Sequence, residues 1–344
     1  MIKRKHSMNE RVTSKDVARI SGVSQSTVSR VFSDKKNLVK PEIQQLVRET
    51  AKNIGYYPNL IARGMISGKT NIVALLIGDN IGPHYNRLIN LFITKIQSLG
   101  KQCLVFQVTR QDNLDAIISR VIQFHVEAAI ITASAMTEHM VKACSENSIP
   151  VILYNRYVEG LPVHTVYADS VTGGTLVADY LYTNGHRNIG YVRFTKDTGE
   201  EIGKKNGLYS RLREYGIDIA QEEKTAYDYD EGYAAALRML HPDKKHLTAV
   251  FCTSDIVALG FMDGARHEYG INIPQELSVI GYDDIAMASW KSYELTTVCS
   301  PTEALVDKVI ATLNISLHKN NHEFITEMLE PFLVERNTVQ KISD

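Results

Sequence analysis

The chain has no apolar run that approaches the roughly 20 residues needed to span a membrane. Its basic first residues, MIKRKHSMNER, are not followed by the apolar stretch of a secretion signal. We therefore expect a cytoplasmic protein with no membrane partner. Its hydrophobic content of 44% and charged content of 22% are close to the averages of soluble globular proteins. With 344 residues, the chain is long enough for two or three folded units.

Cysteine is scarce, and its spacing does not fit the sites that it commonly forms. The four cysteines make no CxxC pair, and each lies in or beside an apolar run. This pattern argues against a disulfide framework and a zinc site, so we predict buried thiols and no bound metal. The four residues are Cys103, Cys144, Cys252 and Cys299.

Several enzyme motifs are also missing from the sequence. There is no GxxxxGK[ST] phosphate loop, no HExxH, no GxSxG and no GxGxxG after the first predicted strand. Asp283 and Asp284 form a carboxylate pair and eleven histidines are present, so acid–base catalysis is the alternative. In a GYDD turn, however, the carboxylates are better suited to hold a ligand than to cleave one. We predict that the protein is not an enzyme and needs no cofactor.

The net charge of −1 conceals a division between the two ends of the chain. Residues 1–69 carry 14 basic and 5 acidic side chains, whereas the remainder carries 24 and 34. A basic N-terminal segment on an acidic body favours contact with a polyanion such as DNA. A solvated charged face is the alternative interpretation of the charge alone.

The basic segment has the pattern of a helix-turn-helix. Thr13 and Asp16 form a T-x-x-D start signal for a first helix, which ends at Gly22. Ser24 caps a second helix over residues 25–32, and Pro41 opens a third. The second helix leaves polar side chains facing outward that can contact base edges or phosphates. A packing motif without DNA contacts is the alternative. The outward residues are Gln25, Ser26, Ser29 and Arg30.

The segments VTSKDVARISGVSQSTVSRVFS at 12–33 and GYYPNLIARGMISGKTN at 55–71 resemble the lactose-repressor and galactose-repressor family. The resemblance runs along essentially the whole chain. It implies a DNA-binding head at 1–57, a hinge at 58–69, and an effector-binding and dimerisation domain at 70–344. The residues it assigns to DNA contact are Thr13, Ser14, Ser24, Gln25, Ser26, Thr27, Ser29, Arg30, Asn59, Ala62, Arg63 and Met65.

The resemblance also implies that the hinge forms a short helix on DNA and pushes an apolar side chain into the minor groove. The wedge position carries Met65, and Gly64 beside it costs a helix roughly 0.5 to 1 kcal/mol relative to alanine. We therefore expect the hinge to become ordered on DNA. A plain flexible linker is the alternative.

After Lys69, short apolar runs alternate with helical stretches, a pattern typical of parallel sheets covered by helices. The fold class predicted for the whole chain is an all-α helix-turn-helix head plus an α/β body. The body contains two doubly wound parallel-sheet lobes of periplasmic-binding-protein type. The first series of strands is predicted at 72–77, 102–107, 128–133 and 151–154, and the second includes 189–192, 249–252 and 277–282.

The resemblance places three crossings between the lobes, near residues 161–163, 297–301 and 322–326. The first lobe then comprises 70–162 and about 300–324, and the second comprises 163–299 and about 325–340. The motifs that carry the resemblance here are ADSVTGGTLVADYLYTNGHRNIGYV (168–192), FCTSDIVALGFMDGAR (251–266), ELSVIGYDDIAMASW (276–290) and ELTTV (294–298).

A ligand is expected between the lobes, at the carboxyl ends of strands and the starts of the following helices. Trp290 is expected to form a flat wall of this site, and ordinary polar lining is the alternative role for each polar residue. Lys204 stands where many members have arginine, and Ser254 stands where many have asparagine, so no single sugar follows from these positions. The residues that the resemblance assigns to the effector are Tyr85, Asn155, Lys204, Ser254, Asp255, Asp283 and Trp290.

We predict a homodimeric transcriptional repressor that binds a palindromic operator in double-stranded DNA. A small polar effector, a sugar or sugar derivative, is expected to control operator binding, as an inducer or as a co-repressor. The chain ends at Asp344 without the extra C-terminal helix of the tetrameric members, so a dimer is the expectation. A transporter's solute-binding protein is the alternative, but it would need export and would have no use for residues 12–66.

Overall fold

The structure of the protein is a computed structural model that describes residues 12–59, 64, 70–78, 82–109, 114–132, 135, 137–318 and 323–342. The chain divides into two units, Met1–Thr70 and Asn71–Asp344, and we call the second unit the body. Three of the predicted DNA contacts, Ala62, Arg63 and Met65, lie outside the described residues. Within the described ranges, no helix combines the length and apolar character that crossing a bilayer requires.

The head folds as predicted, with helices α1 (Ser14–Ser21), α2 (Gln25–Val31) and α3 (Pro41–Asn53) and a 3-10 turn, η1 (Asp34–Leu38). The backbone N–H and hydroxyl of Thr13 donate to the Asp16 carboxylate at 3.1 and 2.8 Å, and they lower the pKa of Asp16 to about 2. Gly22 ends α1 with a left-handed φ of 71°, which glycine adopts without steric cost. The core of the head is small and aliphatic: Val17, Ala18, Val28, Val31, Val39, Val47 and Ala51.

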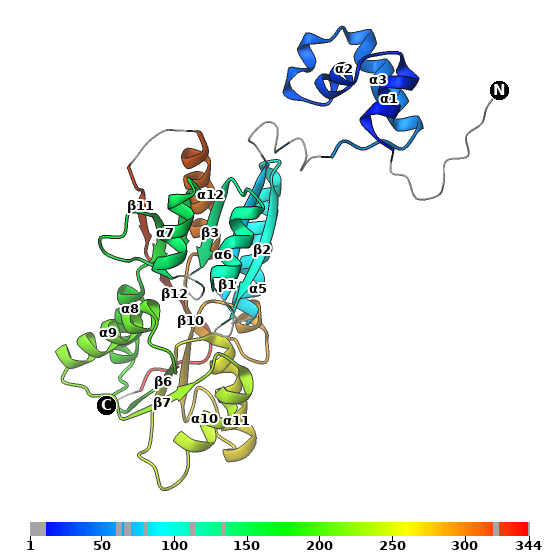
Figure 1. Ribbon diagram of the computed structural model, residues 1–344. Coiled ribbons are helices and arrows are strands. Elements are labelled where there is room, and N and C mark those ends of the chain that lie inside the picture. The colour runs from blue at the N-terminus through cyan, green and yellow to red at the C-terminus, as the bar shows by residue number, and fades with distance from the viewer. Residues whose placement is uncertain are drawn as a thin grey trace. The chain divides into compact units, whose positions relative to one another are not determined.

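The body contains two six-stranded sheets, and each forms the centre of one lobe (Figure 1). All the strand pairs of the first sheet are parallel, in the order β11-β5-β4-β3-β1-β2. Its strands are β1 (Ile72–Gly78), β2 (Gln102–Val108), β3 (Ala128–Thr132), β4 (Val151–Tyr154), β5 (His164–Ala168) and β11 (Thr326–Leu329).

The second sheet has the order β12-β10-β9-β8-β6-β7, and only its β10–β12 pair is antiparallel. The predicted doubly wound architecture is therefore confirmed. Its strands are β6 (Ile189–Phe194), β7 (Gln221–Thr225), β8 (Ala249–Cys252), β9 (Ser278–Tyr282), β10 (Thr296–Cys299) and β12 (Phe332–Val334).

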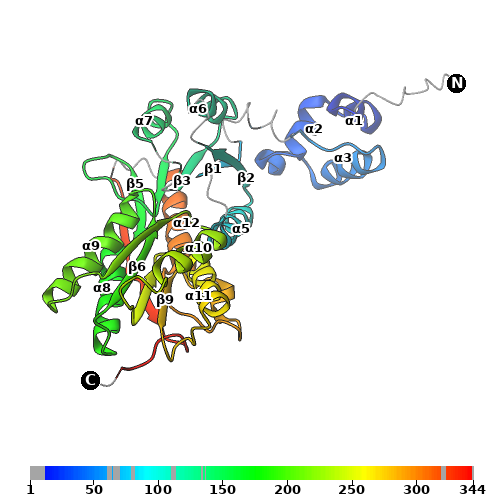
Figure 2. The same ribbon diagram turned by 90° about the horizontal axis from the view of Figure 1, so that it is seen from below.

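Helices cover both faces of each sheet, and each face has its own apolar cluster. One face of the first sheet is covered by α6 (Leu114–Gln123) and α7 (Glu138–Glu146). The other face is covered by α5 (Pro83–Ser98) and α12 (Thr302–His318). The second sheet lies between two further pairs, which Figure 2 shows on opposite sides of β6 and β9. These pairs are α8 (Ser170–Thr183) with α9 (Gly199–Glu214), and α10 (Tyr229–Met239) with α11 (Asp255–Tyr269).

Two of the three predicted crossings between lobes are displaced. Strand β5 pairs with β4 and β11, all in the first sheet, so the first crossing follows Ala168 instead of falling at 161–163. For the same reason, the third crossing follows Leu329 instead of falling at 322–326. The second crossing, between β10 and α12, overlaps the predicted 297–301. The first lobe therefore includes the chain through Ala168. The full burial of Val166 in the core of that lobe agrees with this boundary.

Helices α8 and α9 lie close together because glycines at their interface leave no room for side chains. A Cβ placed on Gly207 of α9 would lie 2.0 Å from the Val171 carbonyl oxygen of α8. A Cβ on Gly174 would lie 2.1 Å from the Lys204 carbonyl oxygen. This contact fixes the position of α9, whose first turns face the space between the lobes.

The substitution Gly207→Ala should therefore lower the free energy of unfolding by about 3 kcal/mol, at the upper end of overpacking costs, because the obstructing atoms are backbone. Gly199→Ala is the matched control on the same helix, since a Cβ there meets nothing within 4 Å, and it should stay within about 0.5 kcal/mol of wild type. Urea unfolding of both variants checks this. Equal stability of the two variants would contradict the packing described.

Candidate functional site

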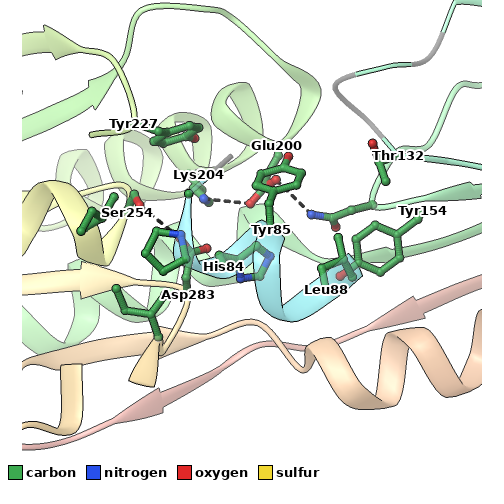
Figure 3. Close-up of a pocket in the computed structure, with 15 residues that line it drawn as sticks. His84, Tyr85, Leu88, Thr132, Tyr154, Glu200, Lys204, Tyr227, Ser254 and Asp283 are labelled. Carbon is green, nitrogen blue, oxygen red and sulfur yellow. Dashed lines mark hydrogen bonds and ion pairs between the residues drawn. The ribbon is translucent and has the colours of Figure 1, made fainter. Parts of the chain in front are cut away.

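A pocket of about 600 Å³, its open mouth included, lies between the two lobes of the body (Figure 3). The first lobe supplies the start of α5 and the ends of β3 and β4, and the second supplies the starts of α9 and α11 and the turn after β9. This is the position expected of ligand sites in open parallel sheets. The lining residues are Gly82, Pro83, His84, Tyr85, Leu88, Thr132, Tyr154, Asn155, Glu200, Lys204, Tyr227, Ser254, Ile256, Asp283 and Ile285.

A buried lysine and its carboxylate partner lie on one wall of the pocket. The Nζ atom of Lys204, which is 1% exposed, lies 2.8 Å from Oε1 of Glu200, one helical turn earlier on α9. Nζ also donates to the Thr253 carbonyl at 3.2 Å and lies 3.8 Å from the centre of the Tyr282 ring. Burial opposes the charge on Lys204, but Glu200 and the further acidic groups around it together hold the pKa of Lys204 above its ordinary value.

Glu200 connects the two lobes. Its Oε2 accepts a hydrogen bond of 2.9 Å from Nδ2 of Asn155, which follows β4 in the first lobe (Figure 3). Asn155 is oriented in turn, because its Oδ1 accepts from the Ala168 backbone N–H at 3.1 Å. Burial raises the pKa of Glu200, but Lys204 overrides that effect and leaves the pKa of Glu200 below its ordinary value. Glu200 is therefore a charged acceptor shared by both lobes.

A second carboxylate, Asp283, lines the pocket from the turn after β9. Its Oδ2 accepts from the Ser254 hydroxyl at 3.2 Å, and burial raises its pKa. The backbone has positive φ at Asp283 (115°), at Asp284 (53°) and at Asn155 (56°) across the pocket. Residues other than glycine seldom adopt such angles, and they are found where surrounding contacts hold them in place.

The pocket has aromatic walls and a buried tyrosine hydroxyl. Tyr85, Tyr154 and Tyr227 line it, and the Tyr227 hydroxyl donates to Glu201 at 3.3 Å. Tyr154 is 3% exposed, and its hydroxyl has no hydrogen-bond partner among the residues that the structure describes. A buried polar atom of this kind is destabilising unless something bonds to it, so a ligand oxygen or nitrogen can satisfy it.

The structure brings together five of the seven residues predicted for the effector: Tyr85, Asn155, Lys204, Ser254 and Asp283. Trp290 is a wrong prediction, since it is 56% exposed and does not line the pocket. The 3-10 turn η2 (Ala286–Ser289) carries the chain outward before it reaches Trp290. Tyrosines, and not Trp290, form the aromatic lining of this pocket.

Asp255 is also displaced from its predicted role, because its side chain is fully buried beneath the pocket. Its Oδ1 accepts from the Thr297 hydroxyl at 2.6 Å and its Oδ2 from the Ile285 backbone N–H at 2.9 Å. Asp255 therefore supports the turn that carries Asp283.

The sequence did not identify Glu200, Tyr227, Thr132, Tyr154 or His84 as lining residues. The i,i+4 spacing of Glu200 and Lys204 was a usable signal, because α9 begins at Gly199 and carries both residues one turn apart.

The head presents a polar surface on α2. Ser24, Gln25, Ser26, Ser29 and Arg30 are exposed, and Thr27 is half-buried. Gln25 donates to the Ser14 hydroxyl at 2.9 Å, so α1 and α2 share this surface, and Ser24 caps α2 by accepting from Thr27 N–H at 3.1 Å. Of the other two predicted contacts that are described, Thr13 is exposed before α1, and Asn59 is exposed beyond α3.

Two family models match the chain. The model described as bacterial regulatory proteins, lacI family, matches residues 13–59, and a periplasmic binding protein-like domain matches residues 178–339. Catabolite control protein A of Priestia megaterium is 31% identical over 295 residues, 84% of this chain and 88% of that protein. The HTH-type transcriptional repressor PurR of Yersinia enterocolitica is 30% identical over 336 residues, 95% of this chain and 96% of that protein.

Solved structures share the fold of the chain. The lac repressor dimer bound to operator and the anti-inducer ONPF matches with a TM-score of 0.85 and 21% identity, covering 96% of this chain and 100% of that one. A complex of the transcriptional regulator CelR with cellobiose matches with a TM-score of 0.70 and 24% identity, covering 95% of this chain and 100% of that one.

The supporting role of Asp255 predicts a specific pH dependence. Burial, followed by the charge of Asp283, raises the pKa of Asp255 well above its ordinary value. The folded protein therefore holds this proton more tightly than the unfolded chain, and the stability it contributes is lost as the pH rises through the folded pKa. Relative to wild type, Asp255→Asn should become more stable as the pH rises from about 5 to about 9.

Thermal unfolding across this pH range measures the difference between the two proteins. Asp255→Ala is the control: near pH 5 it should lose about 1 to 3 kcal/mol because it leaves the Ile285 N–H without its acceptor. This loss should shrink as the pH rises, because the alanine variant also lacks the titrating carboxyl. Parallel stability curves for wild type and Asp255→Asn would show that this carboxyl does not carry the shifted proton.

Proposed function

Because this chain belongs to the lacI family of bacterial regulatory proteins and is a DNA-binding transcriptional repressor regulated by a small-molecule effector, we propose that the effector is a carbohydrate or carbohydrate-like molecule. One observation carries this proposal: a pocket with acceptors and donors from both lobes and with tyrosine walls. Asp283 and Asn155 suit the hydroxyls of such a ligand, and aromatic faces suit its apolar C–H surface. The cellobiose in the CelR complex is a ligand of this class on a related fold.

We propose that the exposed polar surface of α2 reads base edges in the major groove, with Gln25 and Arg30 as base readers and the serines on phosphates. A homodimer would place two heads on a palindromic operator, and the dimer seen in the operator-bound lac repressor supports this arrangement. The proposed DNA-contacting residues are Thr13, Ser14, Ser24, Gln25, Ser26, Thr27, Ser29, Arg30 and Asn59, with Ala62, Arg63 and Met65 outside the described residues.

The pocket can control DNA binding because its two walls belong to different lobes. A ligand that bonds to Asn155 on one side and to Asp283 on the other stabilises one relative position of the lobes over others. The free energy available for regulation is the difference in ligand affinity between those positions.

Arg30→Ala should lower specific operator affinity by about 1 to 3 kcal/mol and relax base preference at one symmetric position, because a bidentate reader of guanine is lost. Selection of binding sites from a random duplex library, followed by fluorescence anisotropy, measures both effects. Lys52→Ala, an exposed cation on α3, should leave the base preference unchanged. An unaltered preference in Arg30→Ala would remove this residue from the reading surface.

Asp283→Ala should abolish the response to the effector and leave operator affinity nearly intact, because its carboxylate lies in the pocket. A thermal-shift panel of neutral sugars, sugar acids, sugar phosphates and nucleobases on the full-length protein identifies the ligand class. A ligand at 100 times its Kd should stabilise wild type by about 2.7 kcal/mol.

The matched control is Asp243→Ala, an exposed carboxylate of the body, which should respond as wild type does. Stabilisation by nucleobases but by no carbohydrate would overturn the proposed ligand class, and a normal response in Asp283→Ala would overturn its place in the pocket.

A further inference from the structure

Among the described residues that line the pocket, Lys204 is the only lysine or arginine, and its charge is already paired. Glu200 lies 2.8 Å from its Nζ atom, while the Thr253 carbonyl and the Tyr282 ring surround the same ammonium group. Lys204 therefore has no direction left in which to meet a ligand anion unless Glu200 moves away.

The remaining charges in the lining do not favour an anion. Asp283 is a second carboxylate, so the two acidic side chains outnumber the one lysine. His84 is the one histidine among the described lining residues. A phosphate or carboxylate placed among these residues would face two like charges in a partly buried site, where screening by water is weak.

We propose that Glu200 is a specificity residue that closes this pocket to anions, so that the effector carries no phosphate or carboxylate group. This inference rests on the proposed function only in taking the pocket as the effector site. Glu200 does this by its position, one turn before Lys204 on α9, where it binds the single pocket ammonium and Asn155 of the other lobe.

The remaining polar groups favour a ligand that donates hydrogen bonds. Carboxylates accept only, so Asp283 and Glu200 require O–H or N–H donors from whatever binds beside them. The unpartnered hydroxyl of Tyr154 can give or take one further bond. Unphosphorylated sugars, polyols and amino sugars supply such donors, whereas a sugar phosphate adds acceptors and negative charge.

The rigid setting of α9 makes this selectivity stable. The Lys204 carbonyl of α9 packs directly against Gly174 of α8, so α9 cannot rotate to turn the Lys204 side chain toward a ligand. Because Asn155 holds the other oxygen of Glu200, the carboxylate is restrained from both lobes. An anion would have to displace two bonds of Glu200 before it gained one with Lys204.

Inorganic phosphate is a probe that tests this inference without knowledge of the effector. Isothermal titration of full-length wild type with phosphate, at constant ionic strength, should show no binding in the millimolar range. Glu200→Gln keeps the size of the side chain but frees the lysine charge, and it should gain phosphate affinity by about tenfold or more, as expected for a charge-assisted hydrogen bond.

Two controls locate the effect. Glu214→Gln removes an exposed carboxylate at the other end of α9, where it pairs with Arg211, and it should behave as wild type does. In the double variant Glu200→Gln with Lys204→Gln, the gain should disappear, because the freed ammonium is gone. If Glu200→Gln unfolds early in a thermal scan, Glu200→Ala is the second variant, with the same expected gain.

The outcomes separate this inference from the proposed function. Anion exclusion is overturned if wild type binds phosphate as tightly as Glu200→Gln does, or if the gain in phosphate affinity survives the loss of Lys204. It is also overturned if any sugar phosphate binds wild type more tightly than the corresponding unphosphorylated sugar. If no carbohydrate stabilises wild type while Glu200→Gln still gains phosphate, the carbohydrate assignment fails and anion exclusion stands.

Discussion

The buried ammonium group of Lys204 is the constraint on which the pocket depends. A charge removed from water is strongly destabilising unless it is paired and hydrogen-bonded. Here Glu200, the Thr253 carbonyl and the face of Tyr282 together meet that requirement, and they come from three separate elements of the second lobe. The need to compensate one charge thus fixes how α9, β9 and the end of β8 approach one another, and it sets the polarity of the ligand site.

A second network supports the strained turns that face this charge. Asp283 and Asp284 follow β9 with positive φ, and their turn is tied down from below and from the side. Asp255 holds the Ile285 N–H from below, and Arg336 donates to the Asp284 carboxylate at 2.6 Å. Asp283 therefore faces the pocket, while Asp284 binds Arg336 and holds the turn in place. Two adjacent carboxylates in one GYDD sequence have different tasks, because Asp284 is paired with Arg336 while Asp283 lines the pocket.

The sequence predicted those elements that have a strong apolar signal and missed those that do not. The buried strands and the valine core of the head follow from hydrophobic runs and capping residues. Strand β7 reads QEEKT and is an edge strand of the second sheet, so no apolar pattern marks it. The short strands β5 and β11 are placed in the first sheet by their pairing, β5 with β4 and β11 with β5, which the sequence does not show; this explains the displaced crossings. Sequence spacing also gives no information on whether a side chain such as Trp290 faces a cavity or solvent.

The bond between Asn155 and Glu200 bears on how a ligand can regulate this molecule. It joins the lobes directly, so an effector that bonds to Asn155 replaces one interlobe contact with another. Such an exchange contributes little net affinity, because the bond lost resembles the bond gained. Affinity must then come from groups without a protein partner in the described structure, such as the Tyr154 hydroxyl, and from the tyrosine walls. Regulation, in contrast, depends on the replacement of the Asn155–Glu200 bond by a bond to the ligand. A ligand changes the populations of the lobe positions only through contacts that differ between those positions.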